Sequence, residues 1–198
     1  MFAVFIEPNE RLKENIRLWK GLIQRSLPDQ PYTRHPPHCT LICTEVLDEG
    51  QAQSQVRDAL HGMQQFSVET EGTHAFWSDS ATDGGHTICW RLKSFSPLFR
   101  LQELVAEAIR PNLAKYTPPD IWGSNSEIKN SLKQYHFPFI GHHWIPHMTI
   151  ASLHVMKDHE LIQKFMKQEE QFTNLVDEIS FWQVNGEKHQ KLSSKRLT

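Results

Sequence analysis

Two short segments of the chain carry residue types suited to proton transfer. Residues 37–43 read PHCTLIC and residues 146–152 read PHMTIAS, so both contain Pro-His-x-Thr followed by an aliphatic residue. A neutral imidazole accepts a proton near pH 7, an imidazolium donates one, and a threonine hydroxyl donates a hydrogen bond to an anionic oxygen. One histidine as base and another as acid, with the hydroxyls on the phosphoryl oxygens, suit phosphodiester chemistry without a metal ion.

Both segments have the composition of β-strands, in which alternate side chains share a face. His38 and Thr40 therefore project together, as do His147 and Thr149, while the residues between them face a core. The two histidines are 109 residues apart, one in each half of the pattern of helices and strands. If the halves pack as pseudo-symmetric sheets, the two pairs face each other across one cleft.

The paired motifs make the chain similar to the 2H phosphoesterase superfamily, which is named for two His-x-Thr/Ser-x motifs on equivalent strands of a bilobal α/β domain. The resemblance covers nearly the whole chain. It implies metal-independent cleavage of a phosphodiester at a ribose 2' oxygen, either a 2',3'-cyclic phosphate or a 2'-5' linkage. It also implies that His38 and His147 are catalytic and that Thr40 and Thr149 bind the phosphate, and it leaves open which histidine is the base.

The resemblance does not fix the substrate, because one fold serves several activities. We expect a hydrolase that acts on a 2',3'-cyclic phosphate or another 2'-linked nucleotide or RNA phosphodiester. A 2'-5' oligoadenylate phosphodiesterase is one alternative. A nucleotide- or RNA-binding protein without turnover is another. For an enzyme with one neutral and one charged histidine, we expect kcat/KM to be bell-shaped around neutrality and unaffected by EDTA.

Composition limits the partners and the compartment. The chain has 198 residues and a formal net charge of -2, which excludes a basic nucleic-acid surface over the whole protein and favours a nucleotide or short RNA as ligand. Its three cysteines form no C-x-x-C pair, which indicates a reducing compartment, the cytoplasm or the nucleus. No segment approaches the roughly 20 apolar residues of a membrane span. We expect a monomer with no membrane association and no cofactor.

Further candidate residues precede the second motif. Tyr135, Phe137 and Trp144 are suited to stacking on a nucleobase, although aromatic side chains more often fill a core. The adjacent pair His142-His143 lacks the spacing of a closed zinc site, so we predict no metal.

Hydrophobic periodicity predicts an α+β fold: a single bilobal domain over residues 1–198, with two mostly antiparallel sheets around a central cleft and helices outside. Residues 111–143 contain four prolines and lack periodicity, which predicts a lid with a short helix near 124–134. The polar residues 187–198 predict a frayed tail. Expected helices span 10–23, 48–63, 96–110 and 157–167, and expected strands span 1–6, 66–76, 86–93, 144–153 and 175–184, with one more beginning at 38.

Overall fold

The computed structural model describes residues 1–115 and 125–198. Its described strands form one antiparallel sheet of eight strands in the order β6-β3-β4-β5-β2-β1-β7-β8. The α+β class predicted from the sequence is confirmed. The strands are β1 (Phe2–Ile6), β2 (Cys39–Thr44), β3 (Phe66–Asp79), β4 (Gly85–Leu92), β5 (His147–Leu153), β6 (Thr173–Val176), β7 (Glu178–Asn185) and β8 (Lys188–Arg196).

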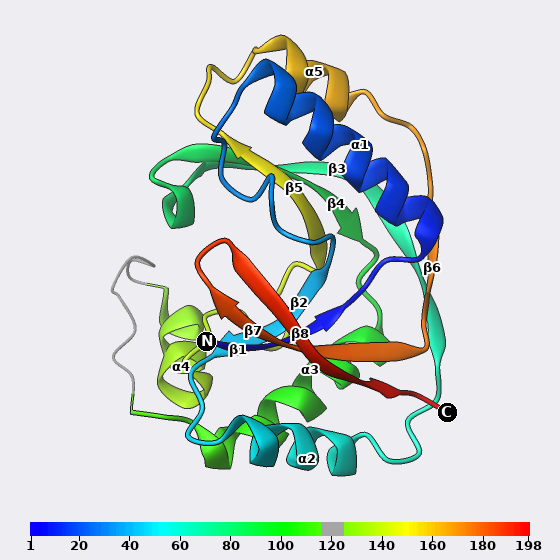
Figure 1. Cartoon of the computed structure of the whole chain (residues 1–198), viewed down its shortest axis with the longest axis vertical. Helices are drawn as coiled ribbons and strands as arrows, with labels where there is room; N and C mark the ends of the chain where they lie inside the picture. Colours follow the sequence, from blue (N-terminus) through cyan, green and yellow to red (C-terminus); the bar gives the residue numbers. More distant parts are fainter. Residues whose placement is uncertain (116–124) are drawn as a thin grey trace.

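The sheet has two halves, β6-β3-β4-β5 and β2-β1-β7-β8, which form the upper and lower lobes in Figure 1. They are joined by one register pair between β2 and β5, Cys39 with Met148. Beyond that pair β5 continues beside the loop that precedes β2, where the Ser152 amide donates to the Pro31 carbonyl. Two sheets were expected, and the structure has one sheet whose two halves are joined at a single register pair.

Each half-sheet is covered by its own helices. Figure 1 shows α1 and α5 over the upper lobe and α2 and α3 along the lower one. The helices are α1 (Glu10–Ser26), α2 (Glu49–Ala59), α3 (Ser96–Ile109), α4 (Ser126–Tyr135) and α5 (Glu160–Met166), with short 3-10 turns at Ser80–Thr82 and Arg110–Asn112.

Helix α1 illustrates how sequence period becomes packing. Its apolar residues recur at helical spacing and are buried as one stripe, which includes Ile16 and Trp19. The Trp19 ring packs edge-on against Phe165 of α5 at 5.2 Å between centroids. Trp90 of β4 packs against the same phenyl ring and donates its indole hydrogen to Asn15 of α1 at 3.0 Å. Helix α1 is thus fixed over β4 by a shared aromatic core.

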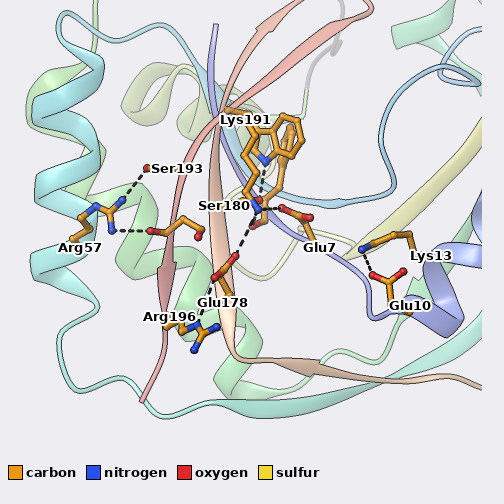
Figure 2. Close-up of polar contacts among 12 residues, drawn as sticks. Glu7, Glu10, Lys13, Arg57, Glu178, Ser180, Lys191, Ser193 and Arg196 are labelled. Atoms are coloured by element: carbon orange, nitrogen blue, oxygen red, sulfur yellow. Dashed lines mark hydrogen bonds and ion pairs between the residues drawn. The ribbon is translucent and has the colours of Figure 1, made fainter.

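The prediction of a frayed tail over residues 187–198 is wrong. These residues form β8, which pairs with β7 along its whole length. Figure 2 shows how β8 is fastened: Lys191 Nζ lies 2.7 Å from a Glu7 carboxylate oxygen, and Arg57 of α2 donates to Ser193 and to the Ser194 carbonyl. An edge strand can expose most of its side chains, so its polar sequence resembles a tail.

The last strand predicted, 175–184, is instead two strands, β6 and β7, interrupted at Asp177.

Within the predicted lid 111–143, the expected helix near 124–134 is confirmed as α4. Residues 116–124 lie outside the described residues, and the lid role stays a prediction. In the described ranges, no helix combines the length and apolar character needed to cross a membrane.

Candidate active site

The two His-x-Thr motifs meet where the half-sheets join. Cys39 and Met148 form the register pair that joins β2 to β5, so the two motifs lie side by side there. Cys39 and Met148 are fully buried, whereas the two histidines and two threonines are half-buried on the other face. A regular antiparallel ladder around this pair would set His38 across from Thr149 and Thr40 across from His147. We call these four residues the square array.

The spacing in this array suits a phosphoryl group. In an antiparallel pair, directly opposite Cβ atoms are about 4.5 to 5.5 Å apart and diagonal neighbours about 7 to 8 Å. In such a ladder His38 and His147 would occupy one diagonal of the square, and Thr40 and Thr149 the other. Two imidazoles at that separation would leave room for a phosphoryl group between them, with a hydroxyl on either side.

The two imidazoles are fixed in the same way. His38 Nδ1 lies 2.6 Å from the Pro36 carbonyl oxygen, and His147 Nδ1 lies 2.7 Å from the Ile145 carbonyl oxygen. A carbonyl only accepts hydrogen bonds, so each Nδ1 carries the hydrogen and each neutral ring has its lone pair on Nε2. Nε2 is thus the basic nitrogen of both rings.

Burial keeps both imidazoles neutral in the free protein. Desolvation lowers the pKa of His38 to about 3, with the nearby His189, Lys20 and His35 acting in the same direction and the hydrogen bond to Pro36 opposing it. Desolvation also lowers the pKa of His147, while the Ile145 carbonyl and the carboxylate of Asp79 oppose this. Among the described residues, therefore, an acidic side chain favours the charged imidazolium at His147 and none does so at His38.

Two phenyl rings support the imidazoles, and the sequence interpretation missed both. Phe5 of β1 stacks on His38 with ring centroids 3.8 Å apart and 17° between planes. Phe76 of β3 meets His147 edge-on at 4.9 Å. Phe5 belongs to the first predicted strand, but its place beside His38 follows from the pairing of Phe5 with Thr40 across β1 and β2. No short sequence pattern predicts which residues of β1 and β2 pair.

The aromatic residues proposed from the sequence lie in other surroundings. Trp144 is only 4% exposed and packs edge-on against Phe99, so its ring belongs to the core. The Tyr135 hydroxyl donates to Glu107, and Tyr135 lines a surface hollow of about 250 Å³ beside α3. Phe137 packs against the core as well. Base stacking by these residues stays a prediction.

A second hollow, of about 350 Å³, is lined by residues around the start of β7, including Glu7, Glu178 and Arg196. Ion pairs among these residues and Lys191 run through it, as Figure 2 shows. Arg196, the one cation in the described lining of this hollow, is thus already paired with Glu178, so the described lining offers no free cation to an anionic ligand.

One described group of side chains has the composition of a metal site. Glu127, His142 and His143 offer ligand atoms that all lie within 4.8 Å of one another. His142 Nε2 lies 2.9 Å from a Glu127 carboxylate oxygen, and His143 Nε2 lies 2.9 Å from the Pro138 carbonyl oxygen. His147 is not a member of this group. The absence of a catalytic metal stays a prediction.

The family model described as the 2'-5' RNA ligase superfamily matches residues 8–188. None of the curated protein sequences is significantly similar to this chain.

Solved structures of similar fold cover the whole chain. The protein TT0787 of Thermus thermophilus superposes with a TM-score of 0.64 at 12% identity, over 99% of this chain and 97% of its own. Escherichia coli LigT complexed with 3'-AMP gives 0.58 at 14% identity, over 100% and 97%. A phosphoesterase gives 0.55 at 12% identity, over 100% and 97%. At these identities the likeness shows the fold.

Proposed function

The chain belongs to the 2'-5' RNA ligase superfamily, and from this membership we propose that it is a metal-independent phosphodiesterase acting on a 2',3'-cyclic phosphate or another 2'-linked nucleotide or RNA phosphodiester. The observation that carries the proposal is the square array of His38, Thr40, His147 and Thr149 at the junction of β2 and β5. The LigT structure with 3'-AMP is consistent with a nucleotide ligand for this fold.

The proposed reaction is the hydrolysis of one P–O bond. A water oxygen attacks phosphorus while one neutral Nε2 takes the proton of that water, and the bond from phosphorus to the ribose oxygen breaks. The second imidazole, charged at that stage, gives its proton to the departing ribose oxygen. The hydroxyls of Thr40 and Thr149 donate to the two non-bridging oxygens, where negative charge builds in the transition state.

We assign the base to His38 and the acid to His147. Burial and, after it, basic neighbours lower the pKa of His38, so it stays neutral and ready to accept a proton. The carboxylate of Asp79 favours the charged form of His147, and a bound phosphodiester anion favours it further. The Asp79 carboxylate is itself fixed by the Thr87 hydroxyl, which donates to it at 2.6 Å.

The test is hydrolysis of 2',3'-cyclic AMP, a 2'-5' linked adenylate trimer and a 3'-5' linked control, measured in EDTA. We expect His38→Ala and His147→Ala each to lower activity on the 2'-linked substrate by about 100-fold or more. His61→Ala is the matched control, because His61 is exposed and outside the array. Hydrolysis of the trimer in preference to the cyclic phosphate indicates an oligoadenylate phosphodiesterase, and the reverse preference indicates a cyclic phosphodiesterase.

Two results would contradict the proposal. One is a rate that stays within about threefold of wild type in either histidine variant. The other is tight nucleotide binding with no hydrolysis of any substrate, which indicates a binding protein. Unchanged thermal unfolding of the variants shows that any loss is chemical.

A further inference from the structure

A second group of basic side chains lies beside His38, contributed by three separate segments. His35 precedes β2, His189 lies on β8, and Lys20 lies on α1. The His35 and His189 rings are 4.3 Å apart between centroids, and His189 is 5.8 Å from the His38 ring. Lys20 Nζ donates to the Tyr32 carbonyl at 2.5 Å, and the Tyr32 ring packs edge-on against His35 at 5.2 Å. We call Lys20, His35 and His189 the basic cluster.

The basic cluster has no acidic partner within the residues that the structure describes. Every described ion pair joins other residues, and the nearest one in sequence joins Arg34 to both Asp29 and Glu187. Both carboxylates therefore have Arg34 as their ion-pair partner, and neither is paired with a member of the basic cluster. Lys20 is only 5% exposed, and its described partner is a neutral carbonyl.

The imidazoles of the cluster are oriented like the motif histidines. His189 Nδ1 lies 3.1 Å from the carbonyl oxygen of Glu187, two residues earlier. The same bond to the residue two positions earlier fixes His38 and His147. Nε2 of His189 has no hydrogen-bond partner among the described residues, and neither ring nitrogen of His35 has one there. These nitrogens are therefore available to a ligand.

The basic cluster carries more positive charge when an anion is bound than when it is not. Burial lowers the pKa of each member, and Lys20 lowers the pKa of both His35 and His189 through charge repulsion. An anion bound between the rings reverses this effect, because opposite charge favours the protonated forms.

We propose that His35 and His189, assisted by the charge of Lys20, form a second phosphate subsite, so that the preferred substrate carries a terminal phosphate in addition to the phosphodiester that is cleaved. This inference rests on the proposed function, because it places the reacting phosphate at His38. The 5.8 Å between the rings of His38 and His189 is short enough for both phosphates to belong to one nucleotide. The substrate class is a 5'-phosphorylated nucleotide with a 2',3'-cyclic phosphate.

The kinetic test compares adenosine 2',3'-cyclic phosphate with and without a 5'-phosphate. We expect the wild-type KM to be about 10-fold lower for the 5'-phosphorylated substrate. His189→Ala and His35→Ala should bring the two KM values together, and the readout is this KM ratio within each variant, because both residues also lie beside the proposed base His38. His189→Lys restores the preference in part because it restores a cation, whereas His61→Ala changes neither KM.

A binding measurement separates this inference from the proposed function. Calorimetry with adenosine 3',5'-bisphosphate and with 3'-AMP needs no turnover. If neither cyclic substrate is hydrolysed but the bisphosphate binds about 10-fold more tightly through His189, the subsite stands and the proposed function fails. If hydrolysis occurs but the 5'-phosphate changes neither KM nor affinity, the subsite is overturned. Equal loss of affinity for both ligands in His189→Ala also overturns it, because that result indicates a structural role.

Discussion

Replacing Lys20 by methionine should stabilise the protein, because the buried ammonium is unfavourable in the folded state. Desolvation lowers the pKa of Lys20 from 10.5 to about 7, and Lys20 is only 5% exposed. At about 1.36 kcal/mol for each pKa unit, carrying this charge in the folded protein costs about 5 kcal/mol. Methionine removes that cost but leaves the Tyr32 carbonyl without its donor, which costs about 1 to 3 kcal/mol. The net gain at pH 6 is therefore about 2 to 4 kcal/mol.

The gain depends on pH with a defined sign. Below the folded pKa of about 7 both the folded and the unfolded protein carry the charge, so the full cost is present. Between that value and the unfolded pKa of about 10.4, the folded protein releases the proton first, and the wild type gains stability as pH rises. At pH 10 the cost has fallen to about 1 kcal/mol, and Lys20→Met should be neutral or destabilising.

The assay is denaturant unfolding of wild type and Lys20→Met at pH 6 and pH 10. Lys164→Met is the matched control, since Lys164 is exposed on α5 and should show no change between the two pH values. A Lys20→Met variant less stable than wild type at pH 6, or equally affected at both pH values, would refute the reasoning. The expected variant is more stable yet loses part of the preference for a 5'-phosphate, which would explain why an unfavourable buried amine is present.

Three further predictions concern the reaction and the fold. Activity falls as His147 loses its proton, and burial lowers the pKa of His147, so the fall of kcat/KM on the alkaline side should lie below pH 6.5. The corresponding fall of kcat should lie at higher pH, because the bound phosphate raises that pKa. Rate measurements from pH 4 to 9 in which both falls coincide would contradict this prediction. Chelation by EDTA should leave the rate within about twofold; inhibition reversed by zinc would implicate Glu127 and its two histidine neighbours. Deleting residues 188–198 should lower the free energy of unfolding by at least about 2 to 3 kcal/mol, because the deletion removes β8 and the buried Leu197. Thermal unfolding measures the effect, and an unchanged unfolding temperature would indicate a frayed tail.

The fold class and the four residues of the square array could be predicted because the signals are local. Alternation along PHCTLIC and PHMTIAS fixes which side chains share a face, and the structure shows His38 with Thr40 and His147 with Thr149 on the half-buried face. The apolar stripe of α1 likewise predicted a helix that begins at Glu10. Family membership follows from the same two motifs and agrees with the match over residues 8–188.

Other features could not be predicted, because they depend on which strands become neighbours. The prediction that the two motifs meet became specific only with the pairing of Cys39 and Met148, which joins β2 to β5. The expected pH dependence of kcat/KM, a bell centred near neutrality, also shifted to lower pH, because burial lowers the pKa of both imidazoles. Burial is a property of the packed molecule and not of any short segment.

The amino-acid sequence by itself determined the two histidine-threonine pairs, the faces they share and the superfamily. Only the tertiary structure decided that residues 188–196 form a strand, that Phe5 lies on His38, and that His189 lies beside His35 and His38. The physical reason is that side-chain alternation is set within a few residues, whereas register between distant segments is set by which surfaces bury each other. A polar edge strand has no strong apolar pattern of its own, so its position follows from the strand to which it pairs.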